Sequence, residues 1–319
     1  MDGEMITASC LGRMGRWGNQ VFQYMFVRSY ARRYELQYQV NPWVGQILYG
    51  HEDPSITVQL PRYDERKSRV GGLKQQPDLN VAWSQSLPPD SREVIGHDFH
   101  GYAQFHTSYY RPEQEFLRGL FAPPEALYDR INPAAENLRQ SPTVIGLHMR
   151  RGDTGRAIFY LTPNEWYLRW LKENWGRFLR PILFIASEDP SDAEVFRDYN
   201  PVTSADLLPL AADRYRLYNY LRCELADPTA ANMDWFPDWH LLTQCDVLLF
   251  GESTFGFTAA MMAQGLRECW RSVLSKQAFI QIDPWDSYPL VREHLGDYPN
   301  VPGTFYTQNP KWRGGEVVP

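Results

Sequence analysis

Three apolar segments in the second half of the chain end abruptly in polar turns, and this repeat constrains the fold more than any other feature. The segments are Val144–Met149, Pro181–Ala186 and Asp246–Phe250, and a helical pattern follows each of them. Strands that alternate with helices predict an α/β fold with a parallel sheet covered by helices. Because the carboxyl ends of parallel strands meet at one edge, where open α/β folds bind ligands, we expect the three polar turns to lie together.

The first of these turns is the most charged, because it runs from His148 to Asp153 through two adjacent arginines. Guanidinium groups match phosphate geometry with paired donors, so Arg150 and Arg151 indicate an anion site. A solvated loop closed by a structural Arg–Asp pair explains this segment equally well. Asp153 is the first candidate for a general base, but the arginines beside it favour its ionised form, so a role in orienting them is equally consistent. The fallback candidates are His97, Asp98, His100 and Glu252.

A glycine-rich turn follows the first predicted strand, Met5–Cys10. It runs from Gly12 to Gln20, and a helix is expected from about Asn19. A strand, glycine turn and helix in this order can aim backbone N–H groups at a ligand. The alternative is a tight turn whose glycines serve backbone geometry alone. The spacing is not that of a dinucleotide-binding fingerprint.

The turn after Asp246–Phe250 contains Ser253 and Thr254 at the expected start of a helix. Their hydroxyl and N–H groups suit a phosphate, and plain capping of the helix is a compatible alternative. Elsewhere, the pattern predicts a strand that ends in a cluster of His97, Asp98 and His100, and a capping box at Thr162–Glu165. The remaining expected elements are strands at Leu36–Val40 and Ala278–Ile282, and helices at Tyr109–Leu120, Glu125–Gln140, Ser191–Tyr199, Tyr215–Leu225, Trp239–Cys245 and Phe257–Leu266.

Composition narrows the class of protein. The 319 residues suffice for two domains, and the break at Ser141-Pro142 suggests residues 1–140 and 141–319, the latter with an irregular tail. A formal net charge of −6 argues against nucleic acid as a partner. The four cysteines are scattered without zinc spacing, which favours a reducing compartment. Because no apolar run is long enough to span a membrane, and no signal peptide is evident, we expect a cytoplasmic protein.

Five segments, in order, resemble the α-1,2-fucosyltransferases, a family that uses GDP-fucose. Residues 15–24 are similar to its G-R-x-G-N-Q-x-F-Q-Y motif, and residues 148–153 match its H-x-R-R-G-D motif. The other three are residues 101–104 with Tyr109 and Tyr110, residues 184–189, and residues 238–260. The sequence departs from the family at Thr154, where an aromatic residue is usual, and at Glu252, where asparagine is common. The segment 253–255 also resembles protein O-fucosyltransferases.

The resemblance implies a GT-B-like fold, in which two Rossmann-like domains face a cleft. The N-terminal domain would face the acceptor and the C-terminal domain would bind GDP-fucose. Arg150 would hold the diphosphate, with Arg151 structural or supporting, and His148 and Asp238 would lie near guanine. The phosphates would be lined by Ser253, Thr254 and Phe255, and Gly18, Asn19 and Gln20 would reach the donor from the other domain.

The expected activity is therefore that of an inverting glycosyltransferase that moves L-fucose from GDP-β-L-fucose to a glycan hydroxyl, most simply α-1,2 to a terminal galactose. Neither a cofactor nor a metal is expected, because no D-x-D pair follows a strand and arginine would stabilise the leaving GDP instead. Two alternatives stay open. One is another linkage or acceptor, including a protein hydroxyl, and the other is a non-catalytic protein that binds nucleotide sugars or glycans.

Overall fold

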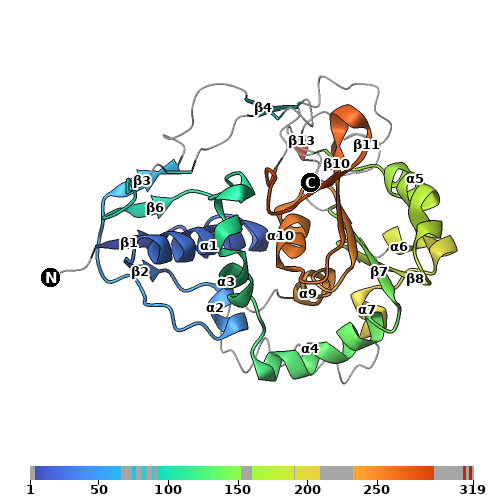
Figure 1. The fold of residues 1–319 in the computed structure, drawn as a ribbon, viewed down its shortest axis with the longest axis horizontal. Helices are drawn as coiled ribbons and strands as arrows, with labels where there is room; N and C mark the ends of the chain where they lie inside the picture. Colours follow the sequence, from blue (N-terminus) through green and yellow to red (C-terminus); the bar gives the residue numbers. More distant parts are fainter. Residues whose placement is uncertain are drawn as a thin grey trace.

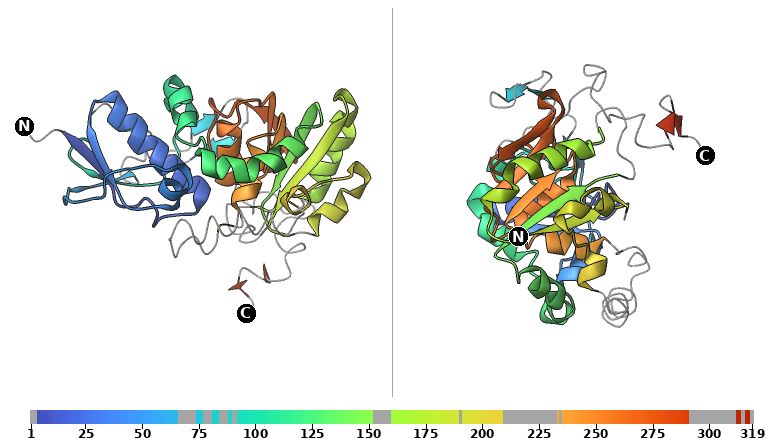
Figure 2. Two further views of the ribbon diagram at one scale, coloured as in Figure 1. Left: turned by 90° about the horizontal axis from the view of Figure 1, so that it is seen from below. Right: turned by 90° about the vertical axis from the view of Figure 1, so that its right-hand side faces the viewer.

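The described part of the chain contains two larger open sheets, of four and five strands, that lie side by side (Figures 1 and 2). The computed structural model describes residues 4–65, 74–76, 81–83, 88–89, 92–151, 160–189, 191–208, 233, 235–290, 312–313 and 316–317. The first sheet uses strands that precede residue 101, and the second uses strands that follow residue 142. Since helices connect and cover the parallel strands, the predicted α/β class is confirmed.

The first sheet has the strand order β2-β1-β6-β3, and each neighbouring pair is parallel. Helix α1 follows β1 and packs on the sheet, where the rings of Phe26 and Phe99 lie 4.3 Å apart between centroids. The sheet elements and their first helices are β1 (Met5–Ala8), α1 (Trp17–Arg33), β2 (Gln37–Val40), α2 (Val44–Tyr49), β3 (Arg62–Asp64) and β6 (Asp98–His100). Two further short strands, β4 (Lys74–Gln76) and β5 (Val81–Trp83), pair with each other.

The second sheet has the order β11-β10-β9-β7-β8. Its strands are parallel except for β11, which pairs with β10 in the antiparallel sense. The strands are β7 (Thr143–Met149), β8 (Pro181–Ser187), β9 (Val247–Phe250), β10 (Glu268–Val273) and β11 (Ala278–Ile282). Two helices lie between the two sheets in the sequence, namely α3 (Gln114–Gly119) and α4 (Glu125–Leu138). The described helices that follow β7 are α5 (Asn164–Asn174), α6 (Asp192–Val195), α7 (Ser204–Leu207), α9 (Phe236–Leu242) and α10 (Thr254–Met262). The strands β12 (Trp312–Arg313) and β13 (Glu316–Val317) pair near the end of the chain.

Side chains alternate between the two faces of the second sheet and thereby belong to two different cores. In β7, Ile145, Leu147 and Met149 join a cluster that includes Trp166 and Trp170 of α5. Val144 of the same strand joins a larger cluster on the opposite face, which contains residues of α9 and α10 and continues into the first sheet. The two halves of the chain therefore share one continuous apolar core.

Strand β10 was not predicted from the sequence. It lies beside β9, and its residues include Arg271, which is 1% exposed, and the buried Ser272. A strand with an arginine and a serine in its buried part lacks the apolar run that reveals β7, β8 and β9. Its polar side chains are instead paired with residues far away in the sequence, as described below.

The predicted capping box at Thr162–Glu165 is wrong. Helix α5 begins at Asn164 with Pro163 as its N-cap residue, and no side chain caps it. The hydroxyl of Thr162 instead lies 2.9 Å from the hydroxyl of Ser272. The predicted strand that ends in His97, Asp98 and His100 is also wrong, because β6 begins at Asp98. Asp98 and His100 lie within the strand, and His97 precedes it.

Other predictions agree with the structure within a few residues, although α9 and α10 begin three residues earlier than expected. The segment Tyr109–Leu120 begins at the last residue of one 3-10 turn, Thr107–Tyr109, and contains a second, Arg111–Glu113, before α3. The segment Ser191–Tyr199 is divided between α6 and a 3-10 turn. The predicted helix at Tyr215–Leu225 lies outside the described residues. The division into domains at residues 140 and 141 stays a prediction, with the second sheet beginning at Thr143.

Candidate active site

The polar turns of the second sheet meet at one edge, as the sequence predicted. In the parallel register, His148 of β7 lies opposite Ala186 of β8 and Phe250 of β9. Each of these residues is at or next to the end of its strand, so the segments that follow leave the sheet together. The edge therefore carries the two arginines that follow β7, Glu188 that follows β8, and the start of α10 that follows β9.

Two helix N-termini converge at this edge, one from each half of the chain. The second residue of α1 is Gly18, and a Cβ atom placed there would lie 2.5 to 2.6 Å from the backbone of Thr254 and Phe255, which begin α10. Only glycine permits this approach. The turn before α1 serves the same contact, because Gly15 has a φ of 79° and a Cβ on it would collide with Asn19.

Asn19 joins the two halves by hydrogen bonds. Its Oδ1 accepts from Gln104 Nε2 at 2.6 Å and from Thr254 Oγ1 at 3.2 Å. Gln20, the next residue, donates from Nε2 to the carbonyl of Gly15 at 3.1 Å and thereby closes the glycine turn. In α10, Ser253 accepts the N–H of Phe255 at 3.2 Å, so the predicted N-cap is confirmed. The geometry thus confirms the local roles of these segments in the turn and the helix cap, and ligand binding by them stays a prediction.

The electrostatic character of the convergence favours an anion. Each helix N-terminus carries partial positive charge, and neither α1 nor α10 has an acidic residue in its first turn. The half-buried side chain of Arg150 is directed to the same turn, where its Nη1 donates to the carbonyl of Glu252 at 3.3 Å. Across the edge, Arg16 from the glycine turn lies 3.8 Å from Glu188. Phosphate groups are ligands that such helix ends and arginines bind.

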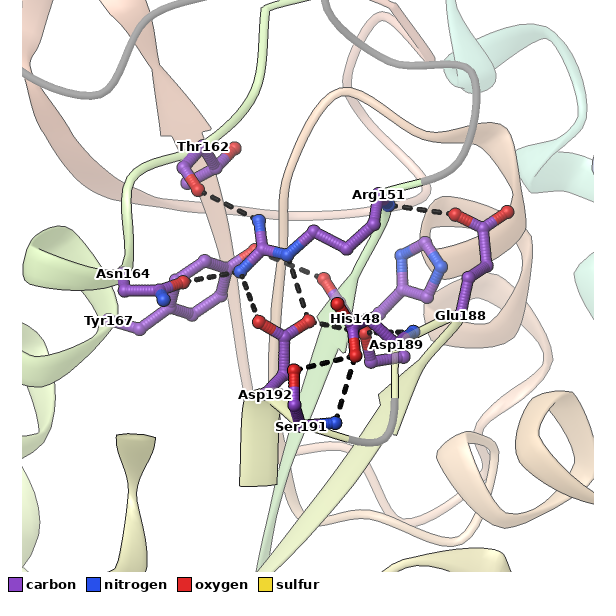
Figure 3. A network of polar contacts seen from close by, with 10 residues as sticks. His148, Arg151, Thr162, Asn164, Tyr167, Glu188, Asp189, Ser191 and Asp192 are labelled. Carbon is purple, nitrogen blue, oxygen red and sulfur yellow. Dashed lines mark hydrogen bonds and ion pairs between the residues drawn. The ribbon is translucent and has the colours of Figure 1, made fainter. Parts of the chain in front are cut away.

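Arg151 is held as a structural residue, which is one of the two roles expected for it. Its Nε donates to Asp192 Oδ2 at 2.8 Å, and its Nη2 donates to Asp192 Oδ1 at 3.1 Å (Figure 3). Nη1 donates to the carbonyl of Thr162 at 3.1 Å, and Nη2 also donates to Asn164. Its backbone N–H donates to Glu188 at 2.8 Å. The guanidinium of Arg151 is thus engaged with protein partners, and the role of Arg150 as the anion ligand stays a prediction.

His148 is buried and neutral. Burial, reinforced by the charges of Arg150 and Arg151, lowers the pKa of its imidazole to about 3. The ring stacks on Phe255 with centroids 5.0 Å apart, and its Nδ1 has no hydrogen-bond partner among the described residues. Phe255 in turn contacts Trp235, at 6.3 Å between ring centroids. The arrangement offers flat apolar surfaces beside the anion site, a combination suited to a nucleotide base.

Asp238, the other residue expected near guanine, lies half-buried in the first turn of α9. Helix α9 begins immediately after Trp235, which also stacks on Trp17 of α1 at 4.8 Å. Its assignment to guanine stays a prediction.

Two fallback candidates for the general base, Asp98 and Glu252, have close partners within the protein. Both oxygens of Asp98 accept hydrogen bonds from β1 and the residue after it, namely from Thr7 at 2.7 Å and from Ser9 at 2.5 and 2.8 Å. The carboxylate of Glu252 is buried and paired with Arg271 at 2.9 Å. The Glu252 carboxylate is therefore not presented to a substrate, whereas Asp98 is only half-buried and stays a candidate. Asp153, the first candidate, lies outside the described residues, as does Thr154.

Three residues of this site escaped sequence analysis: Gln104, Asp192 and Arg271. Gln104 belongs to the segment 101–104 that carries part of the resemblance, so a signal existed for it. Asp192 pairs with Arg151, which lies 41 residues away in the sequence, and Arg271 pairs with Glu252, which lies 19 residues away. Nothing in their local sequence distinguishes them from surface charges.

No group of three or more histidine, cysteine, aspartate or glutamate side chains is arranged to hold a metal ion in the part of the chain that the structure describes. Within the same ranges, no helix combines the length and apolarity that crossing a bilayer requires.

Comparison with known proteins identifies the fold. No model of a known protein family matches the sequence, and no curated protein matches it. Among solved structures, the chain is similar to fucosyltransferase NodZ from Bradyrhizobium, with 13% identity, a TM-score of 0.51, and coverage of 89% of this chain and 100% of that one. NodZ α-1,6-fucosyltransferase co-crystallised with GDP gives 13% identity, a TM-score of 0.50, and coverage of 89% and 99%. The predicted GT-B-like fold with two Rossmann-like halves is confirmed.

Proposed function

We propose that this chain is an inverting fucosyltransferase that uses GDP-β-L-fucose as its donor. The observation that carries the proposal is the convergence of the N-termini of α1 and α10 at Gly18 and Thr254, beside Arg150. Two further observations support it: the resemblance of five segments to GDP-fucose-dependent enzymes, and the likeness of the fold to NodZ, which is named a fucosyltransferase and was co-crystallised with GDP.

The proposed reaction is a displacement at the anomeric carbon of fucose. The hydroxyl oxygen of the acceptor attacks this carbon from the face opposite the diphosphate, the bond between carbon and phosphate oxygen breaks, and GDP departs with the electron pair. The hydroxyl proton passes to a base, for which Asp153 is the candidate. Negative charge grows on the leaving diphosphate, so Arg150 and the two helix N-termini would stabilise the transition state. The proposal needs no metal or cofactor for this step.

Different residues would contact the diphosphate and the guanine of the donor. Arg150, Ser253, Thr254 and Phe255 would face the diphosphate, while Gly18, Asn19 and Gln20 would approach it from the first half of the chain. His148 and Asp238 would lie near guanine. Because His148 is neutral, it would meet the base without a charge.

The proposed acceptor is a terminal galactose of a glycan, joined through an α-1,2 linkage, and the proposed setting is the cytoplasm, where nucleotide sugars are available. The α-1,2 linkage rests on the resemblance of the sequence. The name of NodZ specifies an α-1,6 linkage, and this observation favours transfer through another linkage as the second candidate. Protein O-fucosylation and binding without turnover are the remaining alternatives.

Release of GDP from GDP-fucose tests the proposal. It is measured with and without galactose-terminated acceptors, in EDTA, for the wild-type chain and for Arg150→Ala. We expect release that the acceptor stimulates, that persists in EDTA, and that falls at least about a hundredfold in the variant. Methylation analysis of the product then assigns the linkage. If the chain ignores GDP-fucose and consumes another nucleotide sugar, the donor assignment is refuted.

A further inference from the structure

Arg271 and Glu252 form an ion pair in the interior, directly behind the turn that follows β9. Their side chains are 1% and 0% exposed. Arg271 donates from Nε and Nη2 to Glu252 Oε1, at 3.2 and 2.9 Å. It also donates from Nη1 to the carbonyl of Tyr288 at 2.5 Å, and from Nη2 to the carbonyl of Pro289 at 3.3 Å. One guanidinium thus ties together β10, the turn after β9, and the segment that follows β11.

The backbone of Glu252 belongs to the candidate anion site. Its carbonyl accepts from Arg150 Nη1 at 3.3 Å, and the next residue, Ser253, is the N-cap of α10. Anchoring the Glu252 side chain therefore anchors the peptide that orients Arg150 and begins the helix. Glu252 itself, which is buried against Arg271, has no access to a ligand.

The neighbour of Arg271 on β10 supports the other turn. Ser272 Oγ lies 2.9 Å from Thr162 Oγ1 and 2.7 Å from the hydroxyl of Tyr160. Thr162 in turn offers its carbonyl to Arg151 and packs so closely on Gly251 that a Cβ there would lie 2.4 Å from Thr162 Oγ1. Two adjacent residues of β10 thus underlie both the turn after β7 and the turn after β9.

We infer that Arg271, acting through Glu252, is a positioning residue that holds the turn after β9 and Arg150 in the shape that binds the diphosphate of the donor. This inference rests on the proposed function. A binding group must be held within about half an ångström of its productive position by the contacts behind it. Loss of the pair leaves Arg150 and the start of α10 present but displaced. The affinity for GDP then falls more than the affinity for guanosine, because guanosine carries no diphosphate for this turn to bind.

The test separates positioning from stability. In the double variant Glu252→Leu/Arg271→Met, an apolar pair of similar size replaces the ion pair, a change that buried pairs often tolerate without loss of stability. Arg271→Lys keeps the charge but loses the planar fork that reaches three segments. Arg177→Met is the matched control, because it removes another ion pair to the strand that carries Arg271. In this pair, the exposed Arg177 Nη2 lies 2.5 Å from Oε1 of Glu268 in β10. Thermal unfolding establishes that each variant is folded, and calorimetry gives the dissociation constants for GDP and for guanosine.

We expect both Arg271 variants to bind GDP at least about tenfold more weakly and guanosine within about twofold of the wild-type chain. The control should bind both ligands as the wild-type chain does. A folded double variant that binds GDP as tightly as the wild-type chain overturns the inference, as does an equal loss for GDP and guanosine. If the wild-type chain binds no GDP, the proposed function fails first and the inference falls with it.

Discussion

Two buried histidines should make the fold strongly dependent on pH. His148 lies in the candidate site, and His240 lies in α9, which packs against the same sheet. Burial, reinforced by Arg150 and Arg151, lowers the pKa of His148 to about 3, and burial, reinforced by Arg139, lowers the pKa of His240 to about 4. In the unfolded chain both imidazoles have their ordinary pKa of 6.5.

The sign follows from proton binding. Between pH 6.5 and about 4, the unfolded chain binds protons at both histidines and the folded chain does not, so acid favours unfolding. Above pH 6.5 both histidines are neutral in both states, so they do not lower the free energy of unfolding. As the pH falls from 6.5 toward the pKa values of the folded chain, the free energy of unfolding decreases. At pH 5.0, which is 1.5 units below the ordinary pKa, each histidine costs about 2 kcal/mol, and the two together cost about 4 kcal/mol.

Urea unfolding at pH 7.5 and at pH 5.0 measures this cost as a change in the free energy of unfolding. His240→Leu removes one titrating group, so the difference between the two pH values should shrink by about 2 kcal/mol. Leu242→Val, a buried substitution in the same helix, is the control, because it lowers stability equally at both pH values. An unchanged pH difference in His240→Leu would show that the folded chain admits a proton at this position and would refute the reasoning.

Three further perturbations test how the site is built. Gly18→Ala places a methyl group 2.5 Å from the backbone of α10, so we expect a loss of about 1–3 kcal/mol in urea unfolding and weaker GDP binding by calorimetry; equal GDP affinity would contradict the close approach. Asp192→Asn removes the charge of the carboxylate that accepts two hydrogen bonds from the largely buried Arg151, and should lower the free energy of unfolding by about 3 kcal/mol. Arg118→Met removes hydrogen bonds of 2.9 and 2.8 Å to the carbonyls of Met261 and Ala263, and should lower the free energy of unfolding by about 2 kcal/mol. A variant as stable as the wild-type chain would show that these hydrogen bonds between the two halves do not stabilise the fold.

The parts of the fold that were predictable have local causes. The strands β7, β8 and β9 are runs of apolar residues that are buried on both faces, so their positions and the meeting of their carboxyl ends follow from the sequence. The N-cap at Ser253 is equally local, since its partner is the N–H of Phe255 two residues later. Residues whose environment is set within a few positions of the chain are the ones that sequence patterns describe.

The parts that were missed depend on distant partners. Because of Arg271, the sequence of β10 resembles an exposed segment. The residue is buried because its guanidinium is hydrogen-bonded to Glu252, Tyr288 and Pro289, and these contacts are not evident from the sequence. Thr162 stands in a sequence typical of a helix cap, but its hydroxyl forms a hydrogen bond with the hydroxyl of Ser272, which lies 110 residues later. The resemblance to a family located the segments of the site and left the division of labour between Arg150 and Arg151 open. The structural position of Arg151 depends on Asp192, a residue outside the matched motifs.

The candidate site belongs to both halves of the chain, and its geometry depends on how they pack. Gly18 and Asn19 come from the connection that follows the first strand of one sheet, while Thr254 comes from the connection that follows the third strand of the other. These contacts sit against the continuous core, in which Trp17 of α1 packs on Trp235 and on Trp239 of α9. An anion placed at the convergence would offset the repulsion between two positive helix ends, so binding it would stabilise the junction of the halves. Ligand affinity and the packing of the two halves are therefore linked by the same contacts.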